Sequence, residues 1–175
     1  MEKLFKSVRV KNRSEVGESM SKLIMMVGIP GSGKSTWINE NKGKYDAVIS
    51  RDRIRFSLLK EGEDYFARED DVFKLFIWEI RMSLFNRRNG GTVFADATHL
   101  NKKSRARVLD KVREFADEIE AVVLDTDLET AFERNDQREG RAWVKHGIIR
   151  RMFFTMEMPE EAEGFNKITI IKEEE

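Results

Sequence analysis

Apolar residues in this chain occur in short continuous runs, each bounded by turn-forming or charged residues. Runs that are continuous rather than alternating predict strands that are buried on both faces, as in a parallel sheet. Four such runs lie at residues 23–29, 92–97, 121–127 and 168–171, and a weaker run lies at 46–52. The pattern therefore predicts a parallel sheet of five strands.

The segments between these runs carry apolar residues at helical spacing. The clearest is 70–89, whose apolar stripe ends before Gly90 and Gly91 and fits the core face of a helix. Shorter helices are predicted at 35–41, 103–117, 128–135 and 148–156. Because strands that alternate with helices imply right-handed crossovers, we expect a layered α/β domain.

Composition limits the class of protein. The 175 residues fit one domain, which we place at 21–175, after an N-terminal extension of unknown role at 1–20. The lack of cysteine excludes disulfides and thiolate metal sites, and two histidines are too few for a metal site built from histidine. The first residues lack the apolar core of a secretory signal, and no apolar run is long enough to span a bilayer. We therefore expect a cytoplasmic protein with no membrane partner.

The stretch GIPGSGKS at residues 28–35 fits the complete phosphate-binding pattern G-x-x-x-x-G-K-[ST]. It follows an apolar run and precedes a predicted helix, a context that disfavours a chance glycine-rich turn. Glycines let backbone N–H groups surround a phosphate, and the positive end of the following helix faces the same anion. The residues of this loop that we expect to bind ATP are Gly28, Pro30, Gly31, Ser32, Gly33, Lys34, Ser35 and Thr36.

Two side chains of this loop would act on the donor directly. Lys34 adds a cation for the β- and γ-phosphates, and Ser35 offers a hydroxyl to Mg²⁺, which takes few protein ligands. Asp96, which closes the strand sequence TVFAD, is the candidate for a second group on the magnesium side. An aspartate at the end of a strand would alternatively cap the following turn.

A carboxylate among arginines follows the second predicted strand, in the sequence SRDRIR. Ligands of open α/β sheets bind at the carboxyl ends of the strands, so Asp52 is placed to take the proton of an alcohol acceptor. Arg55 lies one helical turn further on the same side and suits an anionic substrate. The alternative is a surface ion pair between these two residues.

A second basic segment, RNDQREGRAWVKHG, follows the fourth strand and its helix. Arg134, Arg138 and Arg141 lie around Gly140, a hinge-like position. Basic side chains on a segment that folds over the donor phosphates would exclude water and neutralise charge in the transition state, so we predict a small basic lid at about 136–147. A solvated helix–turn–helix is the alternative.

Five pieces of the chain carry a family pattern: GIPGSGKSTW, SRDRIR, DATHLNKKSR, RNDQREGR and AEGFNKITII. Together they resemble the kinase domain of phage-type 5′-hydroxyl polynucleotide kinases, within the adenylate-kinase-like P-loop kinases, over roughly residues 22–171. The resemblance implies the P-loop kinase fold, with ATP and Mg²⁺ as cofactors. It also implies that Asp52 is the general base toward the 5′-hydroxyl, and that Arg55 holds the 3′-phosphate of the terminal nucleotide.

The same resemblance assigns the remaining site residues. Arg138 would contact the donor phosphates from the lid and act in catalysis with Lys34, Asp96 would be the strand-end aspartate, and Thr98 would lie in the acceptor-side loop. Two departures stand out. The lid ends in Val144-Lys145 where relatives often have Val-Pro, and DTDLE at 125–129 lacks the Gly-Thr of a phosphatase motif, so we expect no phosphatase.

The leading interpretation is an ATP- and Mg²⁺-dependent kinase for the 5′-OH end of DNA or RNA. A net charge of zero argues against a protein that coats nucleic acid, but an enzyme that grips only the end needs less basic surface. Two alternatives stay open. One is a kinase of a small alcohol, nucleoside or nucleotide sugar, including toxin-like kinases; the other is a regulatory ATPase that needs no general base.

Overall fold

The structure is a computed structural model that describes residues 20–87 and 90–172, so nearly all of the predicted N-terminal extension lies outside the described residues. Within them, no helix has both the length and the apolar content that crossing a bilayer requires. The strands are β1 (Ser21–Val27), β2 (Ala47–Ser50), β3 (Gly91–Asp96), β4 (Glu118–Asp125) and β5 (Lys167–Lys172). The α-helices are α1 (Lys34–Asn41), α2 (Arg51–Leu58), α3 (Glu69–Asn86), α4 (Lys102–Val112), α5 (Leu128–Asp136) and α6 (His146–Phe154), and short 3₁₀ turns lie at Arg113–Phe115, Gly140–Ala142 and Glu161–Glu163.

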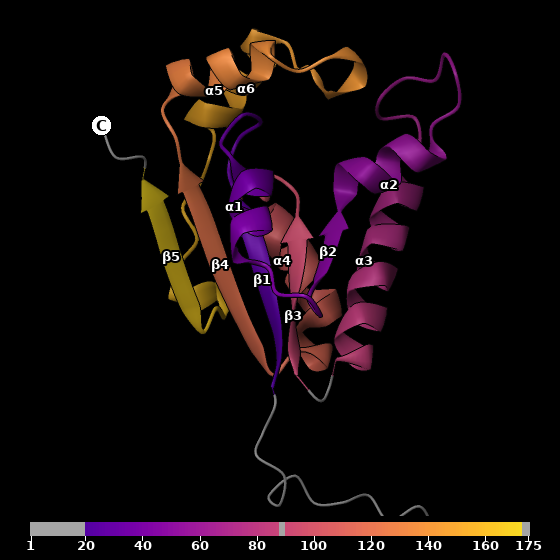
Figure 1. Cartoon of the computed structure of the whole chain (residues 1–175), viewed down its shortest axis with the longest axis vertical. Coiled ribbons are helices and arrows are strands. Elements are labelled where there is room, and N and C mark those ends of the chain that lie inside the picture. Colours follow the sequence, from indigo (N-terminus) through magenta and orange to yellow (C-terminus); the bar gives the residue numbers. More distant parts are fainter. Residues whose placement is uncertain (1–19, 88–89, 173–175) are drawn as a thin grey trace, which may run out of the picture.

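The strands form one parallel sheet in the order β2-β3-β1-β4-β5, which confirms the predicted five-stranded sheet. Strand β1 lies at the centre, with β3 on one side and β4 on the other. All strands point the same way, so the loops that follow them gather at one edge of the sheet, the upper edge in Figure 1. Such an edge is where open α/β sheets bind ligands.

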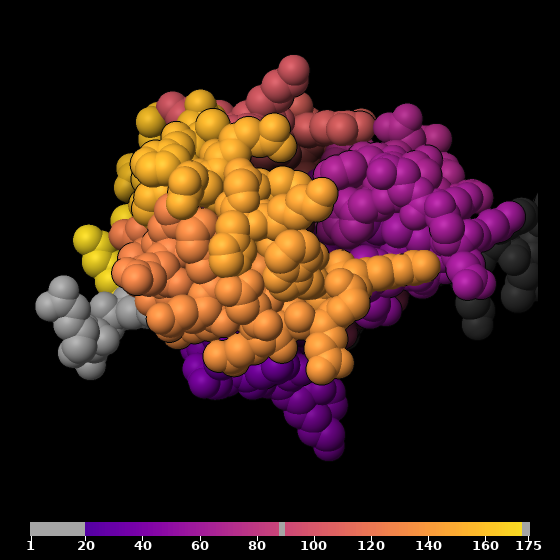
Figure 2. Space-filling view, turned by 90° about the horizontal axis from the view of Figure 1, so that it is seen from above, coloured from indigo at the N-terminus to yellow at the C-terminus, as the bar shows by residue number. Residues whose placement is uncertain are grey.

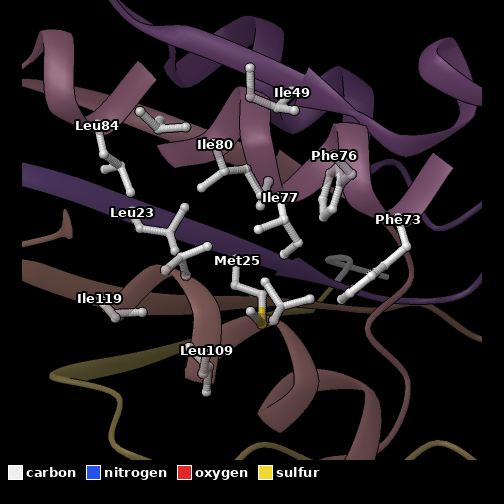
Figure 3. Packing of buried hydrophobic residues seen from close by; sticks show 14 of the residues in the cluster. Leu23, Met25, Ile49, Phe73, Phe76, Ile77, Ile80, Leu84, Leu109 and Ile119 are labelled. Atoms are coloured by element: carbon white, nitrogen blue, oxygen red, sulfur yellow. The ribbon is translucent and has the colours of Figure 1, made fainter. Parts of the chain in front are cut away.

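Successive residues of β1 face two separate cores. Leu23 and Met25 pack with residues of α3 and α4, while Ile24 and Met26 pack with Ile38 of α1. Figure 3 shows the first of these cores, where the side chains of α3 meet those of the sheet. Burial on both faces explains why the strands appear in the sequence as continuous apolar runs.

Helix α3 confirms the core face that its spacing predicted. Its buried residues are Val72, Phe73, Phe76, Ile77, Ile80 and Leu84. The helix ends at Asn86, whereas we expected it to reach residue 89; residues 88 and 89 are outside the described part of the chain.

The predicted helix at 103–117 is wrong at its end. Helix α4 stops at Val112 and tightens into the 3₁₀ turn Arg113–Phe115. The reason lies in β1, because the Ser21 N–H donates to Asp117 Oδ2 at 3.0 Å and the Asp117 N–H donates to the Ser21 carbonyl at 3.0 Å. These bonds turn the chain out of the helix and into the sheet.

Strand β4 consequently begins three residues before the predicted run, at Glu118 rather than residue 121. The two glutamates at its start are tolerated because Lys22 of the neighbouring β1 reaches both. Its Nζ lies 3.2 Å from Glu118 Oε2 and 2.9 Å from Glu120 Oε1.

The second predicted strand, 46–52, is too long, because β2 ends at Ser50 and α2 starts at Arg51. Ser50 caps this helix: its Oγ accepts a hydrogen bond from the Arg53 N–H at 3.4 Å. The cap brings Asp52 into the first turn of a helix that starts at the carboxyl edge of the sheet.

Candidate active site

The loop between β1 and α1 has a backbone that only glycine adopts readily. Gly31 and Gly33 have left-handed φ angles of 86° and 85°. A Cβ at Gly31 would also collide with the backbone of Ala131, because α5 packs directly on the loop. On the other side, the Gly28 N–H donates to the Thr98 carbonyl at 3.1 Å. The loop is thus fixed between α5 and the segment after β3.

Lys34 is the first residue of α1 and folds back into this loop. Its Nζ donates to the carbonyls of Gly28 and Ile29 at 2.9 and 2.8 Å, and lies 3.4 Å from Ser32 Oγ. The ammonium group is therefore positioned where the sequence predicts the phosphates of ATP. Those carbonyls satisfy the cation until a stronger acceptor replaces them.

Three charged residues from other segments of the chain act electrostatically on Lys34. Burial lowers the pKa of Lys34 to about 8, Asp96 and Asp52 oppose this shift, and Arg138 adds to it. Burial also raises the pKa of Asp96, while the charge of Lys34 works in the opposite direction. These mutual effects on pKa indicate that the residues predicted for the donor, the metal, the acceptor and the lid lie within electrostatic range of one another.

Asp52 is the exposed end of a hydrogen-bonded network. Its side chain is 63% exposed, and Oδ1 accepts from Arg55 Nη1 at 2.6 Å and from the Tyr65 hydroxyl at 2.7 Å. Arg55 is buried, with 6% of its side chain exposed, and its Nη2 donates to Glu69 Oε2 at 2.7 Å. Asp52 and Arg55 thus form the ion pair that was the alternative, with the arginine buried and the carboxylate exposed.

Tyr65 and Glu69 are site residues that the sequence did not reveal. Burial and the neighbouring Asp52 raise the pKa of Tyr65, so its hydroxyl stays protonated and serves as a donor. The guanidinium of Arg55 lies over the Tyr65 ring at 4.3 Å, and Glu69 pairs also with Arg51. Both residues thereby fix the orientation of Asp52.

Ser35 and Asp96 offer oxygen atoms of the kind that Mg²⁺ prefers. Asp96 ends β3 beside Ser50 of β2, and Ser35 is exposed in the first turn of α1. Residues 20–87 and 90–172 contain no group of three or more histidine, aspartate, glutamate or cysteine residues able to hold a metal. A Mg²⁺ ion at Ser35 and Asp96 would therefore complete its shell with water and phosphate oxygens, which suits this ion.

The segment predicted to be a lid, residues 136–147, is closed at its base by Asn135. This buried side chain donates to the Val144 carbonyl at 2.8 Å and accepts from the Val144 N–H at 3.0 Å. Arg134, Arg138 and Arg141 are exposed around the segment, and Gly140 has a left-handed φ of 59°. Figure 2 looks onto the carboxyl edge: the segment from α5 to α6 (orange) covers part of it, and α2 with its following loop (purple) lies beside it.

A buried arginine that the sequence did not mark supports the acceptor side. The Arg105 guanidinium makes five hydrogen bonds, two of them to the Glu163 carboxylate at 2.8 Å. A third goes to the His99 carbonyl at 3.0 Å and a fourth to the Glu157 carbonyl at 2.7 Å. Arg105 thus ties the loop after β3, which carries Thr98, to the C-terminal segment.

A family model described as an AAA domain matches residues 23–159. Over 159 residues the chain is 24% identical to "Transcription factor bHLH140" of Arabidopsis thaliana, which covers 88% of this chain and 16% of that protein. Over 149 residues it is 27% identical to "Putative bifunctional polynucleotide kinase/RNA ligase" of Autographa californica nuclear polyhedrosis virus, covering 77% of this chain and 21% of that protein. The chain spans about a fifth or less of the length of these relatives.

Solved structures share the fold at low sequence identity. One chain of "Structure of the Pnkp1/Rnl/Hen1 RNA repair complex" superposes with a TM-score of 0.65 at 21% identity, covering 82% of this chain and 46% of that one. A gluconokinase from Sinorhizobium meliloti 1021 has a TM-score of 0.55 at 18% identity, covering 88% and 83%. The fold is thus shared with a chain of an RNA repair complex and with a gluconokinase.

Proposed function

The chain belongs to the AAA domain family and has a P-loop kinase fold, and from this premise we propose that it transfers the γ-phosphate of ATP to the 5′-hydroxyl end of DNA or RNA. The observation that carries the proposal is the position of Asp52. This exposed carboxylate lies at the carboxyl edge of the sheet, near Lys34 and Asp96, and is oriented by two donors. The similarity to a protein named for polynucleotide kinase activity supports the choice of acceptor.

On the donor side, the loop N–H groups and Lys34 bind the β- and γ-phosphates of ATP. Ser35 and Asp96 would hold Mg²⁺, which would supply charge neutralisation. Arg138 neutralises the charge that spreads over the transferred phosphoryl group in the transition state. Arg134 and Arg141 hold the phosphates from the same segment.

On the acceptor side, Asp52 takes the proton of the 5′-hydroxyl as this oxygen forms its bond to the γ-phosphorus. The bond from that phosphorus to the β–γ bridging oxygen breaks, and ADP leaves. Arg55 and Tyr65 both donate to Oδ1, so among the described residues Oδ2 is the oxygen free to face the substrate. Orientation matters more than basicity here, because a loose transition state needs little push from the nucleophile.

One observation favours a second candidate, a kinase of a small alcohol. Arg55 is only 6% exposed and already bonds Asp52, Tyr65 and Glu69, so an acceptor 3′-phosphate has little access to its guanidinium. A small alcohol needs no such contact, and Asp52 would act on it in the same way. Thr98 would line the acceptor side in either case.

Phosphoryl transfer from γ-labelled ATP to four acceptors separates these functions: a 5′-OH oligonucleotide, a nucleoside 3′-monophosphate, the plain nucleoside and gluconate. We expect the 3′-monophosphate to have a higher kcat/KM than the plain nucleoside, and Arg55→Ala to reduce this difference. Asp52→Asn should lower kcat for every acceptor and spare ATP binding. Asp110→Asn, an exposed control on α4, should leave both kcat and ATP binding unchanged.

Two results would contradict the proposal. If gluconate or the plain nucleoside is used at least as well as the 3′-monophosphate, the small-alcohol kinase is correct. If Asp52→Asn keeps full activity and only ATP hydrolysis is seen, the protein is a nucleotide-binding ATPase without an acceptor.

A further inference from the structure

A groove with a volume of about 690 Å³ lies between α3 and α4, away from the phosphate loop. Four cationic side chains line it: Lys74 and Arg81 from α3, and Arg107 and Lys111 from α4. Trp78, which is 59% exposed, lies in the middle of the α3 side. The site described above uses none of these residues.

The positive charge of this groove is only partly compensated. Asp70 is the acidic residue of its lining, and its Oδ1 lies 3.9 Å from Arg107. Arg81 lies 3.6 Å from Glu114, whose side chain is 74% exposed. Pairs this long and this exposed neutralise little charge, because water screens them.

Two guanidinium groups of the groove lie over aromatic rings. Arg107 lies over the Phe73 ring at 3.9 Å, and Arg81 lies over the Phe115 ring at 4.3 Å. Guanidinium groups and an exposed indole are surfaces on which nucleobases stack, while the cations attract phosphates. Such a combination is typical of sites for single-stranded nucleic acid.

The groove starts beside the acceptor site. Glu69, the first residue of α3, bonds Arg55 and Arg51, and Asp70 at the head of the groove is the next residue. Arg51 also lies over the Phe73 ring at 5.7 Å, so this ring has Arg51 and Arg107 as neighbours. From Asp70 to Met82 the groove follows about 18 Å of helix. In Figure 1, α3 runs from the level of α2 down the length of the sheet.

We propose that this groove binds single-stranded nucleic acid, namely the strand that continues from the 5′ end in the acceptor site. The inference rests on the proposed function for the identity of the strand, and on the groove itself for its binding. Trp78 stacks on a base, and Lys74 and Lys111 contact phosphates.

Fluorescence anisotropy of a 3′-labelled, 5′-OH oligonucleotide of about 12 nucleotides tests the groove directly. Trp78→Ala should weaken binding about tenfold, and Trp78→Phe should restore most of it, since both rings stack. Lys111→Gln should reduce the slope of log K against log salt by about 0.7, the value for one lost phosphate contact. The exposed residues Tyr45 and Lys42, outside the groove, give the control variants Tyr45→Ala and Lys42→Gln, which should behave as wild type.

Kinase assays distinguish whether the groove fails to bind nucleic acid or the proposed kinase function is wrong. Trp78→Ala should lower kcat/KM for the oligonucleotide and leave that for a nucleoside 3′-monophosphate unchanged. If the wild type binds the oligonucleotide through Trp78 but phosphorylates no 5′-OH, the groove is right and the proposed function is wrong.

Two results would overturn the proposal that the groove binds single-stranded nucleic acid. The first is oligonucleotide binding that is the same in Trp78→Ala and wild type, with phosphorylation intact. The second is a dimer of the wild type in sedimentation that Trp78→Ala dissociates while oligonucleotide binding is unchanged, because the groove would then be an interface between copies of the chain.

Discussion

Replacing His99 with asparagine should remove part of the acid sensitivity of the fold. His99 is buried, and its Nδ1 lies 2.7 Å from the Met26 carbonyl, so Nδ1 carries the proton. Its Nε2 is buried without a hydrogen-bond partner among the described residues. Burial, together with the nearby charges of Arg51, Lys34 and Arg105, lowers the pKa of His99 to about 4, although the bond to Met26 acts in the opposite direction.

The magnitude follows from the difference between the folded and unfolded chains. Unfolded, His99 takes up a proton as the pH falls below its ordinary pKa of 6.5, whereas in the fold it stays neutral until about pH 4. Protons therefore bind preferentially to the unfolded chain between these values, and stability is lost as the pH falls. The loss from this residue is about 2 kcal/mol at pH 5 and approaches about 3 kcal/mol below pH 4.

Urea unfolding of the wild type and His99→Asn at about pH 7.5 and about pH 5 measures the pH-dependent contribution of His99 to the free energy of unfolding. Asparagine is the suitable replacement because His99 has a left-handed φ of 44°, which asparagine tolerates. We expect the variant to be less stable at the higher pH, and the difference from wild type to shrink by about 2 kcal/mol at the lower one. A difference that stays constant would refute the reasoning, and His99→Gln provides a second variant that cannot titrate.

Three further predictions concern the site and its support. Lys34→Ala should abolish phosphoryl transfer with little change in the thermal melting curve, because the ammonium group acts on the ligand; near-normal turnover would contradict the donor site. Arg138→Ala should lower kcat about 100-fold while calorimetry shows a much smaller loss of ATP binding, with Arg141→Ala as the parallel variant. If neither substitution slows turnover, the lid has no catalytic role. Arg105→Ala should reduce the free energy of unfolding by about 3–5 kcal/mol in urea titrations, because it leaves the Glu163 carboxylate buried without its cation; a loss below about 1 kcal/mol would show that the network is not structural.

The sheet could be predicted because strands buried on both faces produce an apolar run whatever their neighbours are. Element ends could not, because they depend on partners that are distant in the sequence. The start of β4 is charged, and the ion pairs from Lys22 on β1 make Glu118 and Glu120 compatible with a strand. Helix α2 was missed as an element for a related reason, since it has only two buried residues, one of which is the charged Arg55.

In the site, too, residues in a local sequence pattern were predictable, and residues that depend on distant partners were not. The phosphate loop is one continuous stretch, so its residues were predictable, and Asp52 followed from its place at a strand end. Tyr65 and Glu69 reach Asp52 and Arg55 from 13 and 14 residues away, through a loop with no periodic pattern. Arg105 resembles any helix arginine until the fold brings Glu163 to it from 58 residues away.

The bonds of Arg105 also set an order of assembly during synthesis. The phosphate loop takes contacts from α5, from Thr126 before α5 and from the segment after β3, all of which leave the ribosome before residue 157. The acceptor-side loop gains its anchor later, once Glu157 and Glu163 reach Arg105. A chain that ends before residue 157 is therefore expected to bind nucleotide but not to position an acceptor. During synthesis, the donor half of the site would accordingly form first.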